Sequence, residues 1–582
     1  MSIIKELEDK INVLLKEVIA NEKITILSSS RPDLGDYQIN DSMRLAKVLH
    51  KSPQEIAQAM VVEMEKDSNF TNINIAGPGF INFSLSDEFL IDSMNSIKDD
   101  IHNNIDKINN KTIVLDYGGP NVAKALHVGH LRSANIGEAL KRLLRLLGCN
   151  VISDVHLGDY GRPLGLVLLE IKKRYPDLEF FNENYEGNYG ELDLPITNAD
   201  LEEIYPSASI KAKEDEKYLE EAREITFKIQ NHEKGYYELW QKVVEISKKD
   251  IKTVYDLLGI SFDIWKGESD AAEFIDEVVK TFNDKNLITV SDGAQIVEVK
   301  RDDDNSPMPP LILVKSNDSY SYETTDLATI YDRMQDINPN EIWYLTDERQ
   351  ALHFEQVFRA AKLAGIVSED TLLEHIPFGT MNGKDGKPFK TRDGGIMTLK
   401  GLIDLVISEA KKRINPDIDS NMQEEIATKI GISSLKYADL LPYRRTDYIF
   451  DTDKFALLEG KTGAYLLYSN IRIKSLLNKA KREEIDYSKI SKISSSSDRK
   501  IMLTLLELPK ILKKSYEARS LNDICDYIYN LTALYNNFYS ENRIITCEDK
   551  DLRESWLVLS NVVYQVTLLL LDILGMQVPE KM

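Results

Sequence analysis

A strand pattern that passes directly into a long amphipathic helix constrains the fold of this chain more than any other feature. Residues 112–117 are rich in β-forming side chains, and residues 118–120 are Gly-Gly-Pro. Helical spacing of apolar residues then begins at Gly129 and includes Leu131, Ile136, Ala139, Leu140, Leu143, Leu144 and Leu147. A strand followed by such a helix is the repeating unit of a parallel α/β sheet.

Two histidines lie at this junction, in the segment His127-Val-Gly-His130. They are about one helical turn apart, so both imidazoles can reach one ligand, while Gly129 has no side chain that would exclude a flat base. A helix that begins here directs unpaired N–H groups and the positive end of its dipole toward the turn. This arrangement favours an anion such as a phosphate. Histidines that merely cap the helix or pack against it are the alternative interpretation.

The length of 582 residues predicts several domains, because one hydrophobic core rarely serves so long a chain. We expect a small N-terminal α/β domain over residues 1–110. Strand and helix patterns alternate over 111–415, which predicts a Rossmann-like, doubly wound parallel sheet with an acidic, largely helical insertion at about 176–255. Strand patterns nearly vanish over 416–582, which predicts an all-α bundle.

The individual elements follow from the same periodicities. The N-terminal domain is expected to contain helices near 4–19 and 53–65 and a strand near 72–83. The strands expected in the parallel sheet are 112–117, 151–155, 341–345 and 375–380. The helices expected in the bundle are 423–435, 463–481, 498–518, 521–540 and 552–574.

Composition and charge exclude several classes of protein. A net charge of −23 argues against sequence-blind binding of nucleic acid. Residues 441–482 nevertheless form a basic segment, with nine basic and four acidic side chains. The three cysteines, Cys149, Cys525 and Cys547, are too widely spaced for a zinc site, so we expect no zinc and no metal held by protein ligands. Polar residues interrupt the most apolar segment, 556–576, which predicts a buried helix in a cytoplasmic protein without membrane contact.

Two further motifs follow or open elements of the predicted sheet. Residues 156–161, His-Leu-Gly-Asp-Tyr-Gly, follow the second strand at the edge where open α/β sheets bind ligands; the alternative is an ordinary loop capped by Asp159. Residues 322–326, Tyr-Glu-Thr-Thr-Asp, open a helix with Thr324 or Thr325 as its N-cap. Asp326 then either stabilises the positive end of the helix dipole or, together with Tyr322, binds a planar cation.

A glycine-rich cationic loop spans residues 383–395. It carries Lys384, Lys387, Lys390 and Arg392 between glycines, just before a helix at Leu399. Such a loop suits closure over a polyphosphate, and a solvated hairpin is the alternative. No glycine precedes it at the spacing that a Walker loop requires.

Together these motifs resemble one family, the arginyl-tRNA synthetases, which are class I aminoacyl-tRNA synthetases. The segment Asp116-Tyr-Gly-Gly-Pro-Asn-Val-Ala-Lys-Ala-Leu-His-Val-Gly-His-Leu-Arg-Ser133 resembles the family's active-site stretch. Gly35-Asp-Tyr-Gln-Ile-Asn40 and Gly77-Pro-Gly-Phe-Ile-Asn-Phe83 resemble its additional tRNA-contacting domain. Glu459-Gly-Lys-Thr-Gly-Ala-Tyr-Leu-Leu-Tyr-Ser-Asn-Ile-Arg472 and Pro579-Glu-Lys-Met582 resemble its anticodon-binding bundle.

The resemblance implies two steps: ATP activates L-arginine to arginyl-adenylate, and the terminal ribose of tRNA(Arg) then accepts the arginyl group. It implies that His127, Gly129 and His130 bind ATP, with Mg2+ on the polyphosphate. The family's second class I signature is absent, and Pro388-Phe-Lys-Thr-Arg392 stands in its place. Lys390, with Arg392, and Lys124 are the two open alternatives for the missing positive charge.

The resemblance also assigns the amino acid and tRNA sites. It implies that Asp326 and Tyr322 bind the guanidinium, and that Asn121 and Gln350 bind the amino-acid end with Asp116 nearby. The residues implied for tRNA are Tyr465, Tyr468 and Arg472, whose stacking faces and charge suit single-stranded RNA; the alternative is that both tyrosines are core residues. We expect a monomer. We also expect that no editing domain is needed, because lysine would leave a buried carboxylate of the arginine site unpaired and is therefore rejected.

This chain also departs from the family pattern. Gly118 and Gly119 replace two serines, and Tyr160 and Thr452 each replace a tryptophan. Two other functions remain open from the sequence. One is a class I synthetase for a different amino acid, which the cluster of Tyr322 and Asp326 disfavours. The other is a catalytically inactive tRNA-binding relative that acts as an RNA chaperone or regulator, which the intact His127, His130 and Lys124 disfavour.

Overall fold

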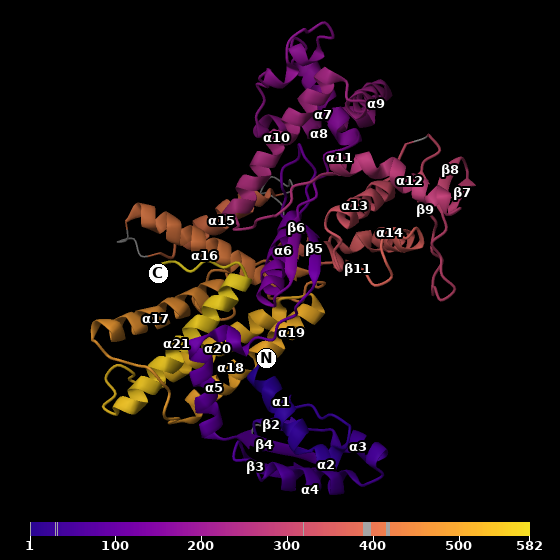
Figure 1. Cartoon of the computed structure of the whole chain (residues 1–582). Helices are drawn as coiled ribbons and strands as arrows, with labels where there is room; N and C mark the ends of the chain where they lie inside the picture. Colours follow the sequence, from indigo (N-terminus) through magenta and orange to yellow (C-terminus); the bar gives the residue numbers. More distant parts are fainter. Residues whose placement is uncertain (1, 30, 32, 318, 388–396, 415–418) are drawn as a thin grey trace. The chain divides into compact units, whose positions relative to one another are not determined.

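A computed structural model of the chain describes residues 2–29, 31, 33–317, 319–387, 397–414 and 419–582. The chain forms two compact units (Figure 1). One comprises Met1–Ile108, Ile414–Ile430 and Ala456–Met582, and the other comprises Asn109–Arg413 and Gly431–Phe455. Helix α16 (Ser420–Leu440) runs through the boundary at residue 430.

The N-terminal part of the first unit is an antiparallel sheet with helices. Its strands, in the order β1-β2-β4-β3, are β1 (Leu27–Ser28), β2 (Tyr37–Ile39), β3 (Phe70–Ala76) and β4 (Phe80–Leu85). Its helices are α1 (Ile3–Leu14), α2 (Lys16–Ile19), α3 (Ser42–Leu49), α4 (Pro53–Met64), α5 (Asp87–Asp99) and the 3₁₀ helix η1 (Ile101–Asn104). The strand predicted near 72–83 is two strands, which meet at the sharp turn that Gly77, Pro78 and Gly79 predict: the positive φ angles of both glycines turn the chain into the β3–β4 hairpin.

The C-terminal part of the same unit is helical. Its helices are α17 (Gly463–Arg482), α18 (Ser496–Leu506), α19 (Leu508–Ala518), α20 (Asn522–Glu541) and α21 (Lys550–Ile573). The predicted helix over 498–518 is two helices, because Pro509 has no N–H to donate to the preceding turn and a new helix begins at Leu508. Helix α21 is long and apolar enough to span a membrane by length and composition, but 67% of its apolar window is buried in the unit.

The second unit is built around a parallel sheet in the order β11-β10-β5-β6, which confirms the predicted fold class. Its strands are β5 (Thr112–Tyr117), β6 (Asn150–Asp154), β10 (Glu341–Leu345) and β11 (Leu372–His375). The strand predicted over 375–380 is wrong in its bounds, because β11 ends at His375, before Pro377, which lacks an N–H for a sheet hydrogen bond.

Helices α6 (Gly129–Leu146) and α14 (Ala351–Leu363) contact the strands of this sheet. Other helices of the unit are α11 (Glu268–Ala271), α12 (Ile275–Asp284), α13 (Tyr322–Asp336) and α15 (Leu399–Lys411), with the 3₁₀ helices η4 (Ala272–Phe274) and η5 (Glu348–Gln350). Val114, Ile342 and Phe354 lie in the buried cluster that joins the sheet to α13 and α14. Two smaller sheets complete the unit: β7 (Ile288–Ser291), β8 (Ala294–Val297) and β9 (Leu311–Val314), and the pair β12 (Met381–Asn382) and β13 (Tyr448–Ile449).

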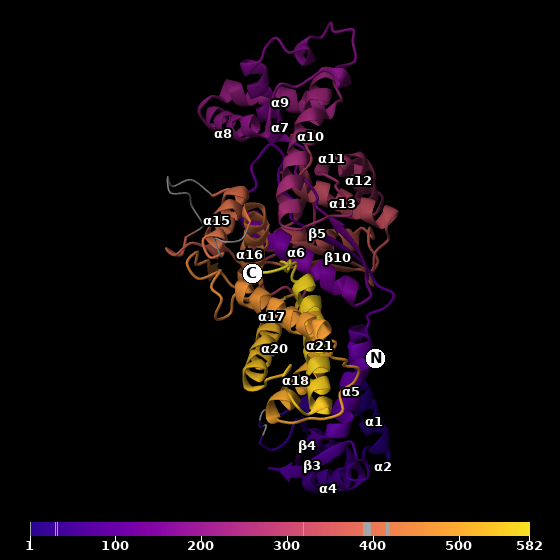
Figure 2. The ribbon, with the colours of Figure 1, turned by 90° about the vertical axis from the view of Figure 1, so that its left-hand side faces the viewer.

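The segment of the predicted insertion, about 176–255, contains helices that lie together with the preceding α7 (Arg162–Arg174) in both views (Figures 1 and 2). They are α8 (Asn198–Glu214), α9 (Glu216–Gln230) and α10 (Lys234–Leu257), with the 3₁₀ helices η2 (Glu179–Phe181) and η3 (Tyr189–Glu191). The buried carboxylate of Glu170 on α7 holds them together by accepting hydrogen bonds from Lys211 and Tyr218. Although burial opposes the charge, these hydrogen bonds lower the pKa of Glu170 to about 2.

Candidate active site

Both predicted histidines lie at the N-terminal end of α6, which begins at Gly129. The backbone N–H of His127 donates to Nδ1 of His130 at 3.0 Å, and the backbone N–H of Gly129 donates to Nδ1 of His127 at 3.0 Å. The ring centroids are 4.0 Å apart. A Cβ on residue 129 would lie 2.8 Å from Cε1 of His127, so only glycine lets this ring fold back over the helix start.

These hydrogen bonds fix the protonation of both rings. An Nδ1 that accepts an N–H bears no proton, so each neutral ring carries its proton on Nε2. Burial and the charge of Lys124 lower the pKa of His127, while burial and His127 lower the pKa of His130 to about 3. Both histidines are therefore neutral at pH 7, and each offers one Nε2–H donor.

The expectation of unpaired backbone N–H groups at this helix start is wrong. The N–H of Gly129 donates to the ring of His127, and the N–H groups of His130 and Leu131 donate to the carbonyls of His127 and Val128. Capping by histidine, which the sequence left as an alternative, does occur. It uses only Nδ1, so each ring keeps an Nε2–H donor that takes no part in the cap.

The chain after the cationic loop is attached to the segment around these histidines, and the chain before the loop is attached to β13. After the loop, the N–H of Val128 donates to the carbonyl of Met397 at 3.2 Å, and the N–H of Leu399 donates to that of Leu126 at 2.7 Å. Before the loop, β12 pairs in parallel with β13. Lys390 and Arg392 lie outside the described residues.

Arg132, one turn into α6, fixes the chain on the N-terminal side of this loop. Its Nη1 donates to the carbonyls of Gly379 and Thr446 at 3.1 and 2.9 Å, and its Nε lies 3.2 Å from the carboxylate of Asp439. Asp439 also accepts a hydrogen bond from Tyr448 in β13. Sequence analysis missed Arg132, although a charged residue directly after Leu131 on an apolar helix face is a signal for a buried ion pair.

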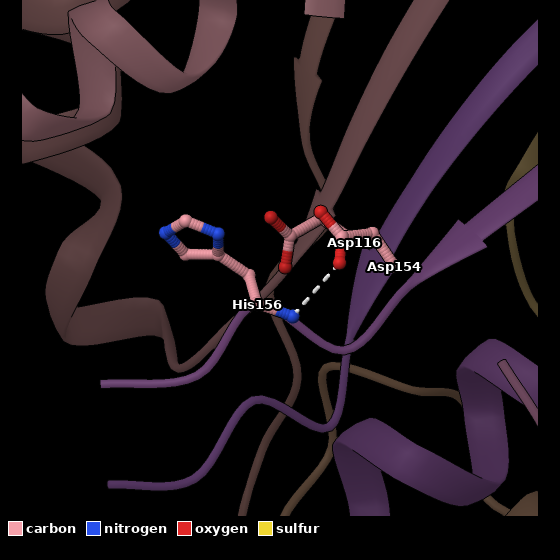
Figure 3. Close-up of side chains that lie close together, drawn as sticks. All are labelled: Asp116, Asp154 and His156. Carbon is pink, nitrogen blue, oxygen red and sulfur yellow. Dashed lines mark hydrogen bonds between the residues drawn. The ribbon is translucent and has the colours of Figure 1, made fainter. Parts of the chain in front are cut away.

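Asp116 ends up in a buried ion-pair cluster at the carboxyl ends of β5 and β6 (Figure 3). Nη2 of Arg333 lies 2.6 Å from the carboxylates of both Asp116 and Asp154, and Asp154 accepts the N–H of His156 at 3.1 Å. Burial raises the pKa of Asp116, although Arg333 opposes this shift. Asp116, Asp154 and His156 are the one metal-like cluster among the described residues, but the guanidinium already pairs with both carboxylates.

Asn121 is exposed on the loop after β5, which joins the His156–Gly161 loop through backbone hydrogen bonds. The N–H of Val122 donates to the carbonyl of Gly158 at 3.1 Å. A Cβ on Gly119 would lie 2.3 Å from the carbonyl oxygen of His156. This close backbone approach leaves no room for a side chain at position 119.

Asp326 and Tyr322 lie at the start of α13, as predicted, but the N-cap is Ser321, whose hydroxyl accepts the N–H of Thr324 at 3.3 Å. The Tyr322 side chain is 65% exposed. Nε2 of His353 lies 2.5 Å from the carboxylate of Asp326. Burial opposes the charge on His353, but hydrogen bonds to Asp326 and Glu323 outweigh it and raise the pKa of His353 to about 9.

Sequence analysis also missed Glu268, an acidic group whose charge interacts with that of Asp326. Burial raises the pKa of half-buried Glu268 to about 7, and the nearby carboxylates of Asp326 and Asp159 act in the same direction. Asp159 is not the helix cap that the alternative interpretation supposed: its carboxylate accepts the N–H and hydroxyl of Ser269. The concentration of carboxylates creates a negative potential that suits a cation such as guanidinium.

Gln350 is exposed at the end of η5, directly before α14, which carries His353. Because β5 and β10 are parallel neighbours, the loops that follow them leave the same edge of the sheet. Asn121 and Gln350 therefore belong to one edge of the sheet. No contact between them is described.

The three residues predicted to bind tRNA lie on α17, in the first unit, and differ in exposure. Tyr468 is 44% exposed, whereas the half-buried Tyr465 accepts a hydrogen bond from Asn536 at 2.9 Å. The guanidinium carbon of Arg472 lies 4.1 Å from the ring centroid of Tyr539 on α20. The core alternative therefore describes Tyr465 better than Tyr468.

Three family models match the chain. They are the catalytic domain of "tRNA synthetases class I (R)" over residues 94–452, the "DALR anticodon binding domain" over 466–582, and the "Arginyl tRNA synthetase N terminal domain" over 2–85. The first alone spans more than half of the chain, and the three follow one another with short gaps.

Curated relatives match over nearly the full length. The arginine–tRNA ligase of Alkaliphilus oremlandii is 43% identical over 558 residues, 95% of each chain. That of Agathobacter rectalis is 41% identical over 574 residues, 96% of each chain.

Among solved structures, the arginyl-tRNA synthetase of Plasmodium falciparum aligns with a TM-score of 0.79 at 24% identity, over 100% of this chain and 99% of that one. The enzyme from Thermus thermophilus aligns with a TM-score of 0.75 at 19% identity, over 100% of both chains. These likenesses show that the fold is shared. Together with the family models and the curated relatives, they show that the chain belongs to the arginine–tRNA ligases, a family of class I tRNA synthetases.

Proposed function

We propose that this chain activates L-arginine with ATP and transfers it to tRNA(Arg), using the residues at the start of α6 to hold the phosphates. The arginine carboxylate attacks the α-phosphate of ATP, a P–O bond forms, and the bond to pyrophosphate breaks. The terminal ribose hydroxyl of the tRNA then attacks the arginyl carbonyl, and AMP leaves. The two neutral histidines with their Nε2–H donors are the observation that supports this assignment most directly.

The first step places negative charge on phosphate oxygens, so catalysis depends on positioned donors and positive charge. Nε2–H of His127 and His130 donate to the ATP phosphates or ribose, and Gly129 leaves room for the adenine. Lys124 supplies positive charge, and Lys390 with Arg392 remains the alternative from the cationic loop. Mg2+ enters as part of the ATP substrate, since Arg333 already pairs with Asp116 and Asp154.

Arginine recognition rests on the carboxylates near α13. Asp326 and Tyr322 bind the guanidinium, Asn121 and Gln350 bind the amino-acid end, and Asp116 supports the site through its ion pair with Arg333. His353 already donates to one oxygen of Asp326, which leaves the other oxygen for the substrate. The guanidinium has several N–H donors in one plane, which can reach Asp326 and Tyr322 together; lysine has no such planar group and is therefore rejected.

The C-terminal helices bind the tRNA through Tyr468, Tyr465 and Arg472, with stacking on Tyr468 as the main contact because its ring is the most exposed of the three side chains. We further propose that the protein acts as a cytoplasmic monomer.

Arginine-dependent exchange of pyrophosphate into ATP tests the function. The assay is run with each amino acid, with and without tRNA(Arg), since the family resemblance implies that activation needs tRNA. Exchange with arginine alone among the amino acids is the expected result. Exchange with another amino acid would point to a different class I synthetase, and no exchange with any amino acid would contradict the enzymatic function.

A matched variant tests the role of Lys124. We expect Lys124→Ala to lower the exchange rate about a hundredfold while leaving the melting temperature unchanged. Near-normal adenylate formation by this variant would shift the role to Lys390.

A further inference from the structure

Lys124 lies against an aromatic ring that comes from the insertion. Its Nζ is 4.4 Å from the ring centroid of Tyr205 on α8, within the range of cation–π attraction. Both side chains are partly buried, which strengthens this attraction relative to water. Tyr205 is 81 residues from Lys124 in the sequence, so no local pattern predicts the contact.

The same group of helices also holds the backbone directly before Lys124. Ala123 has φ +58°, a left-handed conformation that residues other than glycine rarely adopt. Its N–H donates to the hydroxyl of Ser247 on α10 at 3.0 Å, and Ser247 is buried. Helices α8 and α10 thus fix both the backbone before Lys124 and the tip of its side chain.

The ring holds the ammonium group without cancelling its charge. Within the described part of the chain, no carboxylate forms an ion pair with Lys124. A carboxylate would compete with phosphate oxygens for the ammonium group, whereas a neutral ring attracts it only through its quadrupole. The charge of Lys124 reaches the two histidines, because it contributes to the lowered pKa values of His127 and His130.

We propose that Tyr205 is a positioning residue, which holds the Lys124 ammonium beside His127 and His130 so that it meets the phosphates of ATP. The inference rests on the proposed function, since it assumes that Lys124 binds the polyphosphate. It gives the insertion a role in the first step of the reaction: α8 orders a charged side chain that would otherwise sample many rotamers.

Two substitutions distinguish the effect of the aromatic ring of Tyr205 from the effect of its size. Tyr205→Leu removes the aromatic face but keeps an apolar side chain, and Tyr205→Phe keeps the face and loses only the hydroxyl. In pyrophosphate exchange with tRNA present, we expect Tyr205→Leu to lower kcat/KM for ATP about 3- to 30-fold, the range of a partly buried cation–π contact. The KM for arginine should stay constant, and Tyr205→Phe should lie within about twofold of the wild type.

A double-mutant cycle tests whether Tyr205 acts through Lys124. If it does, Tyr205→Leu adds no further loss to a chain that already carries Lys124→Ala. Additive losses, or normal ATP kinetics in Tyr205→Leu, would overturn the inference. A near-normal Lys124→Ala enzyme would remove the role of Lys124 and with it this inference, while arginine-dependent exchange would still support the proposed function.

Chemical modification of Lys124 tests the inference without measuring enzyme activity. Acetic anhydride acetylates exposed lysines, and mass spectrometry of the full-length protein after digestion reports the rate at Lys124. Without ligands, Lys124 should react several-fold faster in Tyr205→Leu than in the wild type or in Tyr205→Phe, while Lys384 should react equally in all three. Equal rates at Lys124 would show that the ring does not hold the ammonium group and would overturn the proposal.

Discussion

The two histidines at the start of α6 use their ring nitrogens for different purposes. Nδ1 accepts a backbone N–H in each ring, which leaves Nε2–H to face a ligand. An asparagine amide superposes on the Nδ1 position of histidine, and a glutamine amide superposes on Nε2. The capping and donor functions can therefore be removed one at a time.

We expect His127→Asn to keep the melting temperature and lose about a hundredfold in exchange rate, because it caps Gly129 but lacks the distal donor. His127→Gln should retain more of the rate and melt at a lower temperature, because it loses the cap. Thermal melting and pyrophosphate exchange measured on both variants check this. The opposite ranking would contradict the assigned tautomer.

Glu268 makes a pH dependence of arginine binding predictable. Its pKa of about 7 means that it gains negative charge as the pH rises from 6 to 8, and an anionic neighbour of Asp326 favours the guanidinium. We expect the KM for arginine to fall about three- to tenfold over this interval. Glu268→Gln should give a flat profile, and a wild-type profile that is also flat would remove Glu268 from the arginine site.

At the scale of elements, the ends of the cationic loop are tied to α6 through Arg132 and through residues 397–399. Arg132 contributes both an ion pair with Asp439 and hydrogen bonds to the carbonyls of Gly379 and Thr446. These two contributions can be distinguished, because only the hydrogen bonds position the chain that leads into the loop.

Arg132→Met should destabilise the protein by about 3–5 kcal/mol, because the carboxylate of Asp439 loses its buried partner. Adding Asp439→Asn removes the unpaired charge and should restore most of the melting temperature. The double variant should still show a raised KM for ATP, because Gly379 and Thr446 have lost their donor. A normal KM for ATP in the double variant would make Arg132 purely structural.

Periodicity predicted the elements whose patterns are uninterrupted. The bounds of β5 and β10 agree with the predicted 112–117 and 341–345, because each strand contains an apolar run, 113–115 or 342–345, in a buried parallel sheet. The prediction was wrong where one residue decides, as at Pro509, which divides 498–518, and at Pro377, which follows the end of β11.

The residues of the candidate site fall into the same two groups. Residues that lie in one contiguous motif, such as His127 and His130, could be found from the sequence. Tyr205, Arg333 and Glu268 come from distant segments, and only the fold brings them near Lys124, Asp116 and Asp326, respectively. The sequence does contain one indication that Arg333 is buried, because this residue stands three residues after Ile330 on the buried face of α13.

At the scale of the whole molecule, the proposed chemistry and the proposed tRNA contacts lie in different units. Tyr468 is the exposed aromatic residue among the three predicted on α17. We expect Tyr468→Ala to raise the KM for tRNA about 5- to 100-fold, the loss of one stacked base, without changing the KM for ATP. Tyr465→Phe, which removes only the hydroxyl that accepts from Asn536, is the matched control.

Aminoacylation kinetics with varied tRNA and varied ATP check this prediction. A change in both KM values would indicate that Tyr468 supports the fold of the bundle. No change in either would assign anticodon contact to other side chains.

Helix α21 carries a consequence for synthesis of the protein. It packs against α17 and α20, where Thr567 accepts a hydrogen bond from Asn470 and Ser560 accepts one from Tyr535. The ribosome makes α17 and α20 first, so the apolar faces that pack against α21 remain uncovered in the nascent chain until residues 550–573 have been made. A truncated product would leave them uncovered, and such surfaces recruit chaperones or aggregate. The helices that pack against α21 therefore complete their core only after residues 550–573 have been made.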